Sequence, residues 1–385
     1  MTRKQLLVEI YDHLTGALLK TWTNAQLMRF TKEINKGLSE CVIVLGEAYD
    51  YTGTELAEGN DVVVRIYDGD CAPSTLLTIY SGYISSFETN LAERDAGVRV
   101  HLLGYHTLLA TDVFKDGTTT TIAYTAEDVG AVMQDIIDKF NAAYGYEVFS
   151  YTSTSIPTAG QDIDYTFQRK TYREAMDKAR ELAPATHYFY IDETNLVTFK
   201  PIPTTPTHSF TLGRHFSALS VSKSIEKIRN GLLIWDGVSG GTPVHKLYTD
   251  SASQARYGRR TQIETDYGIV ESDADLYAAR FLLENKEPET ILTVDIMDNN
   301  ANEDGMGYDI ESIQPGDTCE FVGFAEAFAN KYLSKNMLIT KVVYTLSGAT
   351  LTIDPRLHGF FDTQEELRKQ LADTQSSGVP STYTT

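Results

Sequence analysis

The sequence predicts a mainly β fold in which two antiparallel β blocks are separated by an α+β insert. The first block, at about 4–109, contains short runs with apolar residues at every second position, as in Leu6, Val8 and Ile10. Such alternation places one apolar face toward a core, which is typical of a half-buried antiparallel sheet or barrel. The second block, at about 220–354, repeats the pattern at 232–235, 290–297, 318–322 and 337–353. Two similar blocks in one chain favour a part of a symmetric assembly over an enzyme with one pocket.

Residues that favour turns separate the runs of the first block. Two further alternating runs are Val62, Val64 and Ile66, followed by Val98, Val100 and Leu102. Gly, Asp and Asn adopt turn conformations at low cost and so mark the breaks between strands. The sequence therefore predicts turns at 12–16, 51–53, 68–70, 81–82 and 95–97.

The character of the sequence changes between the blocks, over 118–203. Six apolar residues recur there at the spacing of one helix face: Val129, Val132, Met133, Ile136, Ile137 and Phe140. Thr125 is the predicted N-cap of this helix, because Asp128 then lies in the first turn, where the helix dipole favours an acid. Gly145 is predicted to end the helix.

A second helix and a hairpin are predicted in the rest of the insert. The helix begins at Thr171, where Glu174 completes a capping box, and ends before Pro184. The runs 187–192 and 196–201 are joined by a short polar segment, which indicates a β-hairpin. A stiff linker back to the second block is indicated by Pro201, Pro203 and Pro206.

A third helix, at about 273–285, interrupts the second block. Ser272 is its predicted cap, and its apolar positions are Leu276, Ala279 and Leu283. The second block is therefore expected to be discontinuous in sequence. A short helix followed by a small, polar and flexible tail is expected at the C-terminus. The resulting division is 1–115, the first β-barrel domain; 116–206, the α/β insert; 207–249 with 288–358, the second β-barrel domain; 250–287, a small helical insert; and 359–385, the C-terminal helix and tail.

Composition sets the broad class of the protein. A chain of 385 residues is long enough for two or three domains with sizeable cores. Its three cysteines, Cys41, Cys71 and Cys319, are far apart and odd in number, so a disulfide framework is not expected. The N-terminus enters a strand pattern directly, and no run reaches the roughly 18 apolar residues of a membrane helix. We expect a protein that is made in a cytoplasm and used in solution, without a membrane-spanning segment.

The charge of the chain bears on its partners. The formal net charge is −20, which is the wrong sign for a protein that grips nucleic acid by neutralising phosphates. Surface repulsion that keeps the protein soluble is one explanation. A surface past which polyanions must move without sticking is the other. Composition does not decide between them.

Most motifs of enzymatic or metal chemistry are absent from the sequence. It contains no HExxH, no zinc-type Cys/His spacing and no phosphate-loop or dinucleotide fingerprint. The segment 237–241 matches Gly-x-Ser-x-Gly literally, but it is glycine-rich and follows a strand, so a hairpin tip is the simpler interpretation. The eight histidines are spread along the chain, at 13, 101, 106, 187, 208, 215, 245 and 358. A pair of glycosidase carboxylates could come from any of 53 acids, so their number carries no information. The sequence predicts no catalytic, cofactor-binding or metal-binding residues and no cofactor.

Two loops nevertheless have open alternatives. The glycine-rich segment 237–241 could cradle an anion, but after a strand it is more simply a hairpin tip. The segment 298–305 has oxygen-bearing side chains at 298, 300 and 302, as at the start of an EF-hand loop. Glu303 stands where such a loop needs its sharp-turn glycine, and no flanking helices are predicted. A solvated loop, a partner-contact loop and a calcium site remain the alternatives.

The order of short patterns along 1–355 resembles the tail hub, or baseplate hub, proteins of bacteriophages and the hubs of contractile injection systems. The segments 80–84 and 103–109 are similar to the strand and closing turn of the first hub domain. The segments 171–176, 188–192 and 196–199 resemble the helix-then-hairpin module of the family, and 228–234 resembles the Asn-initiated strand that reopens the second barrel.

The resemblance implies a structural, non-enzymatic role. Hubs of this family are trimers whose two tail-tube-like barrels per chain make six similar units around a channel. Such a ring joins the six-fold tail tube to the three-fold tail tip. The implied partners are two further copies of the chain, a distal tail or tail tube ring, a tape measure protein and a tip or fibre protein below the hub. DNA would pass through an acidic lumen without specific binding, and the expected location is the virion.

Two other classes of function remain open on the sequence. One is a tail-associated protein that degrades cell-surface polysaccharide or binds a receptor, although the chain leaves little room after the second block for such a domain. The other is a β-rich binding protein unrelated to virions.

Overall fold

The computed structural model describes most of the chain, with short gaps between its segments. The described residues are 4–23, 25–46, 55–68, 76–90, 97–184, 186–239, 242–265, 269–298, 307–325, 329, 333 and 336–355. The predicted turn at 51–53, most of the predicted turns at 68–70 and 95–97, the C-terminal helix and tail at 359–385, and most of the loop 298–305 lie outside these residues.

The first block is an antiparallel sheet of seven strands. Its strands are β1 (Lys4–Tyr11), β2 (Leu18–Trp22), β3 (Gln26–Glu33), β4 (Gly37–Gly46), β5 (Asp61–Asp68), β6 (Leu77–Asn90) and β7 (Gly97–Leu103). They pair in the order β2-β1-β5-β6-β7-β4-β3. The predicted alternation is confirmed, since Val8, Val62 and Val100 are all fully buried on the inner face. A 3-10 helix, η3 (Tyr105–Ala110), follows β7.

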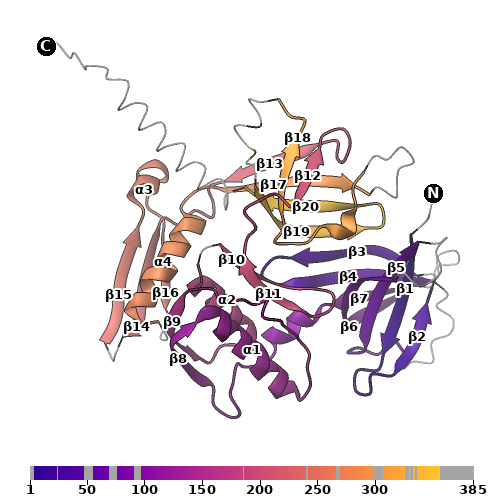
Figure 1. The fold of residues 1–385 in the computed structure, drawn as a ribbon, viewed down its shortest axis with the longest axis horizontal. Coiled ribbons are helices and arrows are strands. Elements are labelled where there is room, and N and C mark those ends of the chain that lie inside the picture. Colours follow the sequence, from indigo (N-terminus) through magenta and orange to yellow (C-terminus); the bar gives the residue numbers. More distant parts are fainter. Residues whose placement is uncertain are drawn as a thin grey trace.

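The second block continues the same sheet. Its strands are β12 (His208–Thr211), β13 (Leu219–Ser224), β17 (Glu289–Met297), β18 (Thr318–Val322), β19 (Met337–Thr345) and β20 (Gly348–Asp354), with a 3-10 turn η5 (Ile310–Ser312). Strand β19 pairs antiparallel with β3, so both blocks form one 13-stranded sheet (Figure 1). The mainly β fold is confirmed, and a single core runs through both blocks.

The first insert contains the predicted helices and hairpin. Its elements are β8 (Thr121–Asp128), α1 (Val129–Tyr144), β9 (Asp162–Gln168), α2 (Tyr172–Leu182), β10 (His187–Ile191) and β11 (Val197–Pro201). The capping box of Thr171 and Glu174 is present as predicted, and Gly145 ends α1 in the left-handed conformation at φ 79°. Strands β10 and β11 pair as the predicted hairpin.

The start of α1 differs from the prediction. Asp128 itself is the N-cap, and its carboxylate accepts a hydrogen bond from the Gly130 amide at 2.8 Å. The same carboxylate also accepts from the amides of Ala159 and Gly160. Thr125, the predicted cap, lies inside β8. An ionised acid can accept several amide bonds at once, which is the reason that Asp128 takes this position.

A second insert is larger than the sequence indicated. It contains β14 (Gly231–Ser239), β15 (Thr242–Thr249), α3 (Ser251–Tyr257), β16 (Thr261–Thr265) and α4 (Glu271–Asn285). Strand β14 is central in a separate three-stranded sheet, where it pairs antiparallel with β15 and parallel with β16. Placing 231–249 in the second barrel was therefore wrong, and so was reading 228–234 as the reopening of that barrel. The segment 237–241 does join two paired strands, as expected of a hairpin.

Helix α4 also departs from its prediction. Val270 is its N-cap residue and makes no side-chain capping bond, while Ser272 lies inside the helix. The predicted positions are not the buried ones, since Leu276 and Leu283 are half-buried and Ala279 is exposed. The buried residues of α4 are Asp273, Ala274, Tyr277, Ala278 and Arg280. Two charged residues on the buried face hid the helical periodicity, which is measured by apolar residues alone.

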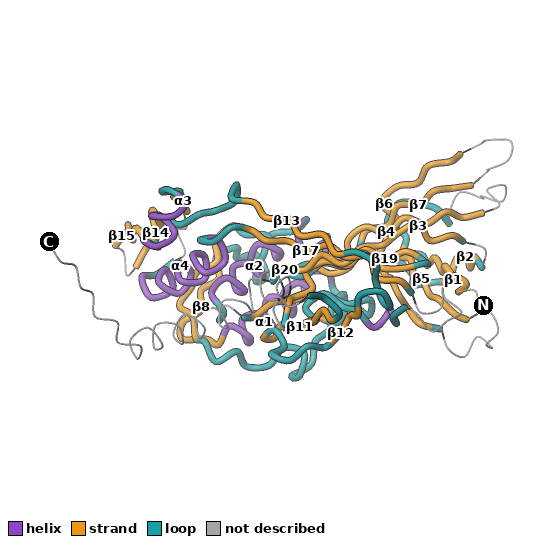
Figure 2. Tube along the Cα trace, turned by 90° about the horizontal axis from the view of Figure 1, so that it is seen from above, coloured by secondary structure: helices purple, strands orange, loops and turns teal. Residues whose placement is uncertain are grey.

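The two inserts share one core. Buried residues of α1, α2, β9, β14 and α4 belong to the same apolar cluster, which includes Phe140, Met176, Ile234 and Tyr277. Figure 2 shows the helices gathered at one end of an elongated molecule and the strands β1 and β2 at the other. The division of the structure is thus between a β sheet and a joint insert body.

One predicted turn lies within a strand. Ser81 and Gly82 are in the middle of β6, which continues for 14 residues. A Cβ at Gly82 would overlap the carbonyl oxygen of Leu103 on the neighbouring strand. The glycine is there because backbone approaches backbone closely, and the sequence alone does not distinguish this use from a turn.

Candidate functional site

Buried charge identifies the side chains that connect the parts of the molecule. Burying a charge is costly unless it is paired and hydrogen-bonded, so each such residue marks a built contact. Among the described residues, and leaving histidines aside, the buried charged side chains are Lys32, Lys178, Asp273, Arg280 and Asp298.

Lys32 connects three segments that are distant in sequence. It comes from β3 and is 3% exposed. Its Nζ donates to Glu193 Oε2, in the turn between β10 and β11, and to Gln314 Oε1, just after η5, both at 3.0 Å. Ser81 of β6 donates to the carbonyl oxygen of Glu193 at 2.7 Å. The first block, the second block and the hairpin therefore meet in one buried cluster of polar side chains.

Aromatic rings surround this lysine. Phe30 and Tyr344 face each other across the β3–β19 ladder and stack with centroids 4.4 Å apart. The Lys32 ammonium lies 5.4 Å from the centroid of the Tyr344 ring. Burial lowers the pKa of Lys32, and the charge of Glu193 opposes that shift. The ion pair with Glu193 thus favours the charged form of Lys32, while burial disfavours it.

The β3–β4 turn is fastened to the hairpin of the first insert. Asn35, at φ 57°, donates its amide to the carbonyl of Phe189 at 2.8 Å and accepts the Phe189 amide on its side chain at 3.2 Å. The Asn35 carbonyl accepts a hydrogen bond from Arg173 of α2. A Cβ at Gly37 would lie 2.7 Å from the Ile191 carbonyl oxygen. The insert is therefore held rigidly against the first block.

Arg280 of α4 joins the two inserts. Its guanidinium donates to the carbonyls of Ala183 and Pro184, both at 3.2 Å, and to that of His187 at 2.9 Å. These carbonyls follow the C-terminus of α2, where a positive charge is favoured by the helix dipole. Glu284 pairs with the Arg280 Nε at 2.9 Å. Burial lowers the pKa of Arg280.

Asp273 is a second buried charge of α4. Its carboxylate accepts the amide of Asp164, in β9, at 3.1 Å. Burial raises the pKa of Asp273 to about 7, against the effect of that amide and with a further increase from the Asp164 charge. This carboxyl group therefore changes its protonation near neutral pH.

A His–Asp–Tyr arrangement occurs in the second block. His208 lies between Tyr308, with Nδ1 3.0 Å from the hydroxyl, and Asp317, with Nε2 3.0 Å from Oδ2. Asp317 Oδ2 also accepts the Gln314 amide at 2.9 Å. Although the residue types suggest acid–base chemistry, His208 is 5% exposed and stacks on Phe210 within the core. Its arrangement serves to satisfy a buried imidazole.

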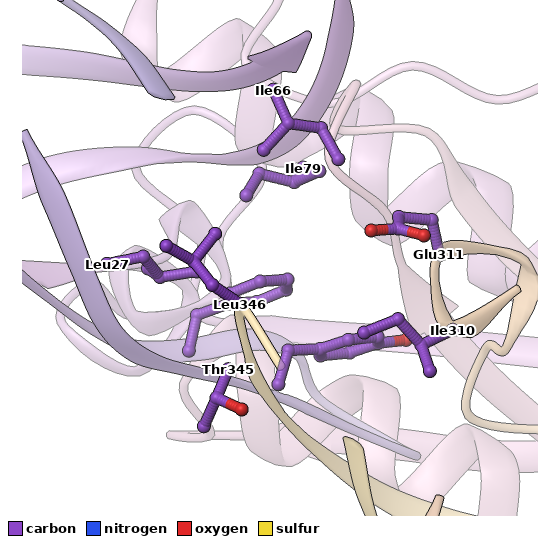
Figure 3. Close-up of a pocket in the computed structure, with 9 residues that line it drawn as sticks. Leu27, Ile66, Ile79, Ile310, Glu311, Thr345 and Leu346 are labelled. Atoms are coloured by element: carbon purple, nitrogen blue, oxygen red, sulfur yellow. The ribbon is translucent and has the colours of Figure 1, made fainter. Parts of the chain in front are cut away.

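A small apolar hollow lies where η5 approaches the two blocks. Figure 3 shows Leu27, Ile66, Ile79, Ile310, Glu311, Thr345 and Leu346 around it. Its walls are mostly aliphatic, with Phe30 and Tyr344 completing them. Among these lining residues Glu311 is the one with a charge, so the hollow does not pair titratable groups for catalysis.

The other histidines are dispersed. His101 lies 3.7 Å from Glu40 on the sheet surface, and His215 accepts the Thr211 amide at 3.1 Å. His106 is buried in η3, where burial lowers its pKa to about 4. In the described ranges no group of three His, Cys, Asp or Glu side chains could hold a metal ion. The calcium alternative for 298–305 falls mainly on residues outside the described ranges.

Two further observations concern the general class. Both cysteines within the described segments, Cys41 and Cys319, are buried free thiols, and burial raises their pKa. Within the same segments, no helix combines the length and the hydropathy needed to cross a membrane.

The connecting residues were missed by sequence reasoning. Lys32 has the same parity as Phe30 on β3, so a charge at an inward position was the available signal. For Arg280 and Asp273 the comparable signal was charge on the side of α4 that the structure buries. These residues hold the sheet, the hairpin and the helices in fixed relative positions. Their arrangement is that of structural contacts and does not resemble a catalytic site.

The fold was compared with known proteins. No protein-family model matches the chain, and no curated protein does. Among solved structures, the tail protein from Neisseria meningitidis MC58 aligns at a TM-score of 0.58 and 10% identity, over 91% of this chain and 96% of that one. The 43 kDa tail protein of prophage MuSo2 from Shewanella oneidensis aligns at 0.60 and 12% identity, over 92% and 99%. This chain has the fold of prophage tail proteins.

A third solved structure extends the tail-protein likeness to another organism. The prophage tail protein gp18 from Listeria monocytogenes EGD-e aligns at a TM-score of 0.53 and 12% identity, over 96% of this chain and 99% of that one. The alignments include both β blocks and both inserts, since they span nine-tenths or more of the chain. The predicted resemblance to phage tail proteins is confirmed at the level of the fold.

Proposed function

We propose that this chain is a structural hub of a bacteriophage tail. Three copies form a ring that joins the six-fold tail tube to the three-fold tail tip, within the virion. The ring is assembled in the host cytoplasm, and its role is not enzymatic. Its neighbours are a distal tail or tail tube ring on one side, a tip or fibre protein on the other, and the tape measure protein.

The union of two β blocks in one sheet carries this proposal. The β3–β19 ladder fixes the blocks relative to each other, and the Lys32 contacts hold the insert against both. A rigid chain with two such blocks supplies six units from three copies. Closed ring symmetry of this kind is the usual way in which identical chains build a channel.

The acidity of the chain supports a role around DNA. Each copy has a formal net charge of −20, and acids that face a channel would repel phosphates. The Debye length at physiological salt is about 8 Å, so only charges near the duplex act in this way. DNA would pass without specific binding.

Native mass spectrometry of the purified chain tests the ring. The expected result is a species of three chains, and addition of isolated tail tubes should place it at one tube end in electron micrographs. A stable single chain that does not bind tube ends would overturn the proposal. A gel-shift assay with duplex DNA at physiological salt should show no complex.

A further inference from the structure

The three-stranded sheet of the second insert has one face packed and one face open. Leu232 and Ile234 point inward and are fully buried. Lys246 and Tyr248, on the same side, each reach Asp275 of α4 at 2.6 Å. The alternate positions of the three strands therefore point away from α4.

These positions form what we call the outer face: the odd-numbered residues of 231–235, 245–249 and 261–265. Its middle row is Leu247, Leu233 and Ile263, which the strand register places side by side. Leu247 is 58% exposed and Ile263 is 67% exposed. Trp235 is 45% exposed and stacks on His245 with ring centroids 4.0 Å apart. The remaining outer positions carry threonine or glycine.

The outer face contains no Asp, Glu, Lys or Arg, in a chain with 86 such residues, 33 basic and 53 acidic. Single exposed apolar residues are common, but a row of them beside a Trp on a flat sheet is typical of a contact surface. The sheet lies at the end of the molecule opposite β1 and β2, so it is accessible to another protein (Figures 1 and 2).

A basic corner adjoins this face. It consists of Lys223, Arg256, Arg259 and Arg260, of which Arg259 and Arg260 directly precede β16. Arg260 Nη1 donates to the carbonyl of Ile225 at 3.0 Å, which brings the 223–229 segment to the start of β16. The stretch 219–265 has seven Lys and Arg against four Asp and Glu, reversing the balance of the whole chain.

We propose that the outer face and the basic corner dock on a second copy of this chain. The whole chain has 53 acidic against 33 basic residues and a formal net charge of −20, so a neighbouring copy offers the complementary charge. Opposite charges at the rim of an apolar contact steer association and fix its register. The inference rests on the proposed ring and names one surface that holds it together.

The size of the face indicates that other contacts contribute. Three strands spaced about 4.8 Å apart, each about five residues long, present roughly 250 Å². A stable interface buries about 800 Å² on each partner, so the face supplies roughly a third of that area. Disrupting it is therefore expected to weaken the assembly of the full chain rather than to abolish it.

Sedimentation velocity across a concentration series tests the proposal with the full-length chain. Ile263→Asp and Leu247→Asp each place a charge in the middle row and should raise the dissociation constant of the assembly about tenfold or more. Leu14→Asp is the matched control, because Leu14 is 92% exposed on the first block and far from this sheet. It should leave the dissociation constant unchanged. Far-ultraviolet circular dichroism establishes that each variant is folded.

A charge reversal gives an independent arm. Arg256→Glu combined with Arg259→Glu, two exposed side chains of the basic corner, should weaken assembly and reduce its dependence on salt. If the wild type assembles and all of these variants assemble equally well, the outer face is not the contact, and the proposed ring stands. If the wild type is monomeric at every concentration, both the contact and the ring are overturned. If one middle-row variant fails to fold, the other middle-row variant and the charge reversal still test the contact.

Discussion

The buried side chain of Lys32 connects β3 with the β10–β11 turn and with the segment after η5. Removing one partner of a buried pair leaves the other without compensation, which costs more than the pair itself contributes. Glu193 is partly exposed at 20%, so water can relieve part of that cost. Breaking the contact is therefore expected to cost less than breaking a fully buried ion pair.

Replacement of Lys32 by methionine should destabilise the fold. We expect Lys32→Met to lower the free energy of unfolding by about 2 kcal/mol, because Glu193 and Gln314 lose their shared donor. Urea unfolding followed by circular dichroism measures this. The control is Lys36→Met, which breaks a half-exposed pair with Glu33 and should change the free energy by about 0.5 kcal/mol or less. Equal effects of the two variants would contradict the prediction.

The Asp273 carboxyl group makes stability depend on pH. Its pKa is about 7 in the fold and about 4 when unfolded, so between these values the unfolded chain has released a proton that the fold retains. The free energy of unfolding therefore falls as pH rises from about 4 to 7. Asp273→Asn keeps an acceptor for the Asp164 amide and should be more stable than wild type by about 1 to 2 kcal/mol above pH 7.

Thermal unfolding at pH 4.5, 6 and 8 measures the Asp273 effect. The advantage of the variant should be largest at pH 8 and close to zero at the lowest pH. Glu271→Gln, on the exposed side of the same helix, is the control and should show no such trend. An advantage of Asp273→Asn that does not vary with pH would count against this assignment.

At the scale of elements, β6 depends on a glycine that the neighbouring strand approaches. Gly82→Ala should cost about 2 kcal/mol or more, since the new methyl group would overlap the Leu103 carbonyl and force the strands apart. Gly97→Ala is a milder comparison, because its Cβ would lie 3.2 Å from a Val44 side chain that can adjust. Chemical unfolding of both variants should show a clearly larger loss for Gly82→Ala.

Sequence patterns predicted the individual helices and strands better than they predicted which strands pair with each other. The alternation at Leu6, Val8 and Ile10 and the capping box at Thr171 are local, and both are present in the structure. The β3–β19 ladder joins distant strands and leaves no local signal. For the same reason β14 and β15 were assigned to the wrong sheet, since alternation shows that a strand has a buried face without showing what covers it.

The candidate site was harder to predict than the fold. Lys32, Asp273 and Arg280 act through partners far away in the sequence, and charge on an apolar face reads locally as a break in the pattern. Asp128 replaced Thr125 as a cap because the 159–160 loop supplies two more amides. Such partners become visible only when the chain is folded.

At the scale of the whole molecule, the inserts should open as one unit. Arg280→Met removes donors to three carbonyls after α2 and should increase amide exchange in both α2 and α4 by roughly 30-fold, equivalent to about 2 kcal/mol. Hydrogen exchange measured by mass spectrometry resolves these helices from β1 and β5, which should keep their protection. Lys246→Met, a half-exposed pair with Asp275, is the control. Faster exchange confined to α4 would contradict the shared core.

The shared core of the inserts also determines when it can form during synthesis, because its two parts are far apart in the sequence. Phe140 and Met176 leave the ribosome well before Tyr277 and Ala278, against which the same cluster closes. During that interval the apolar residues of the first insert that will contact the second insert remain exposed, while the strand Gly231–Ser239 is still being synthesised. Nascent chains stalled ahead of residue 271 should therefore be the ones that recruit chaperones.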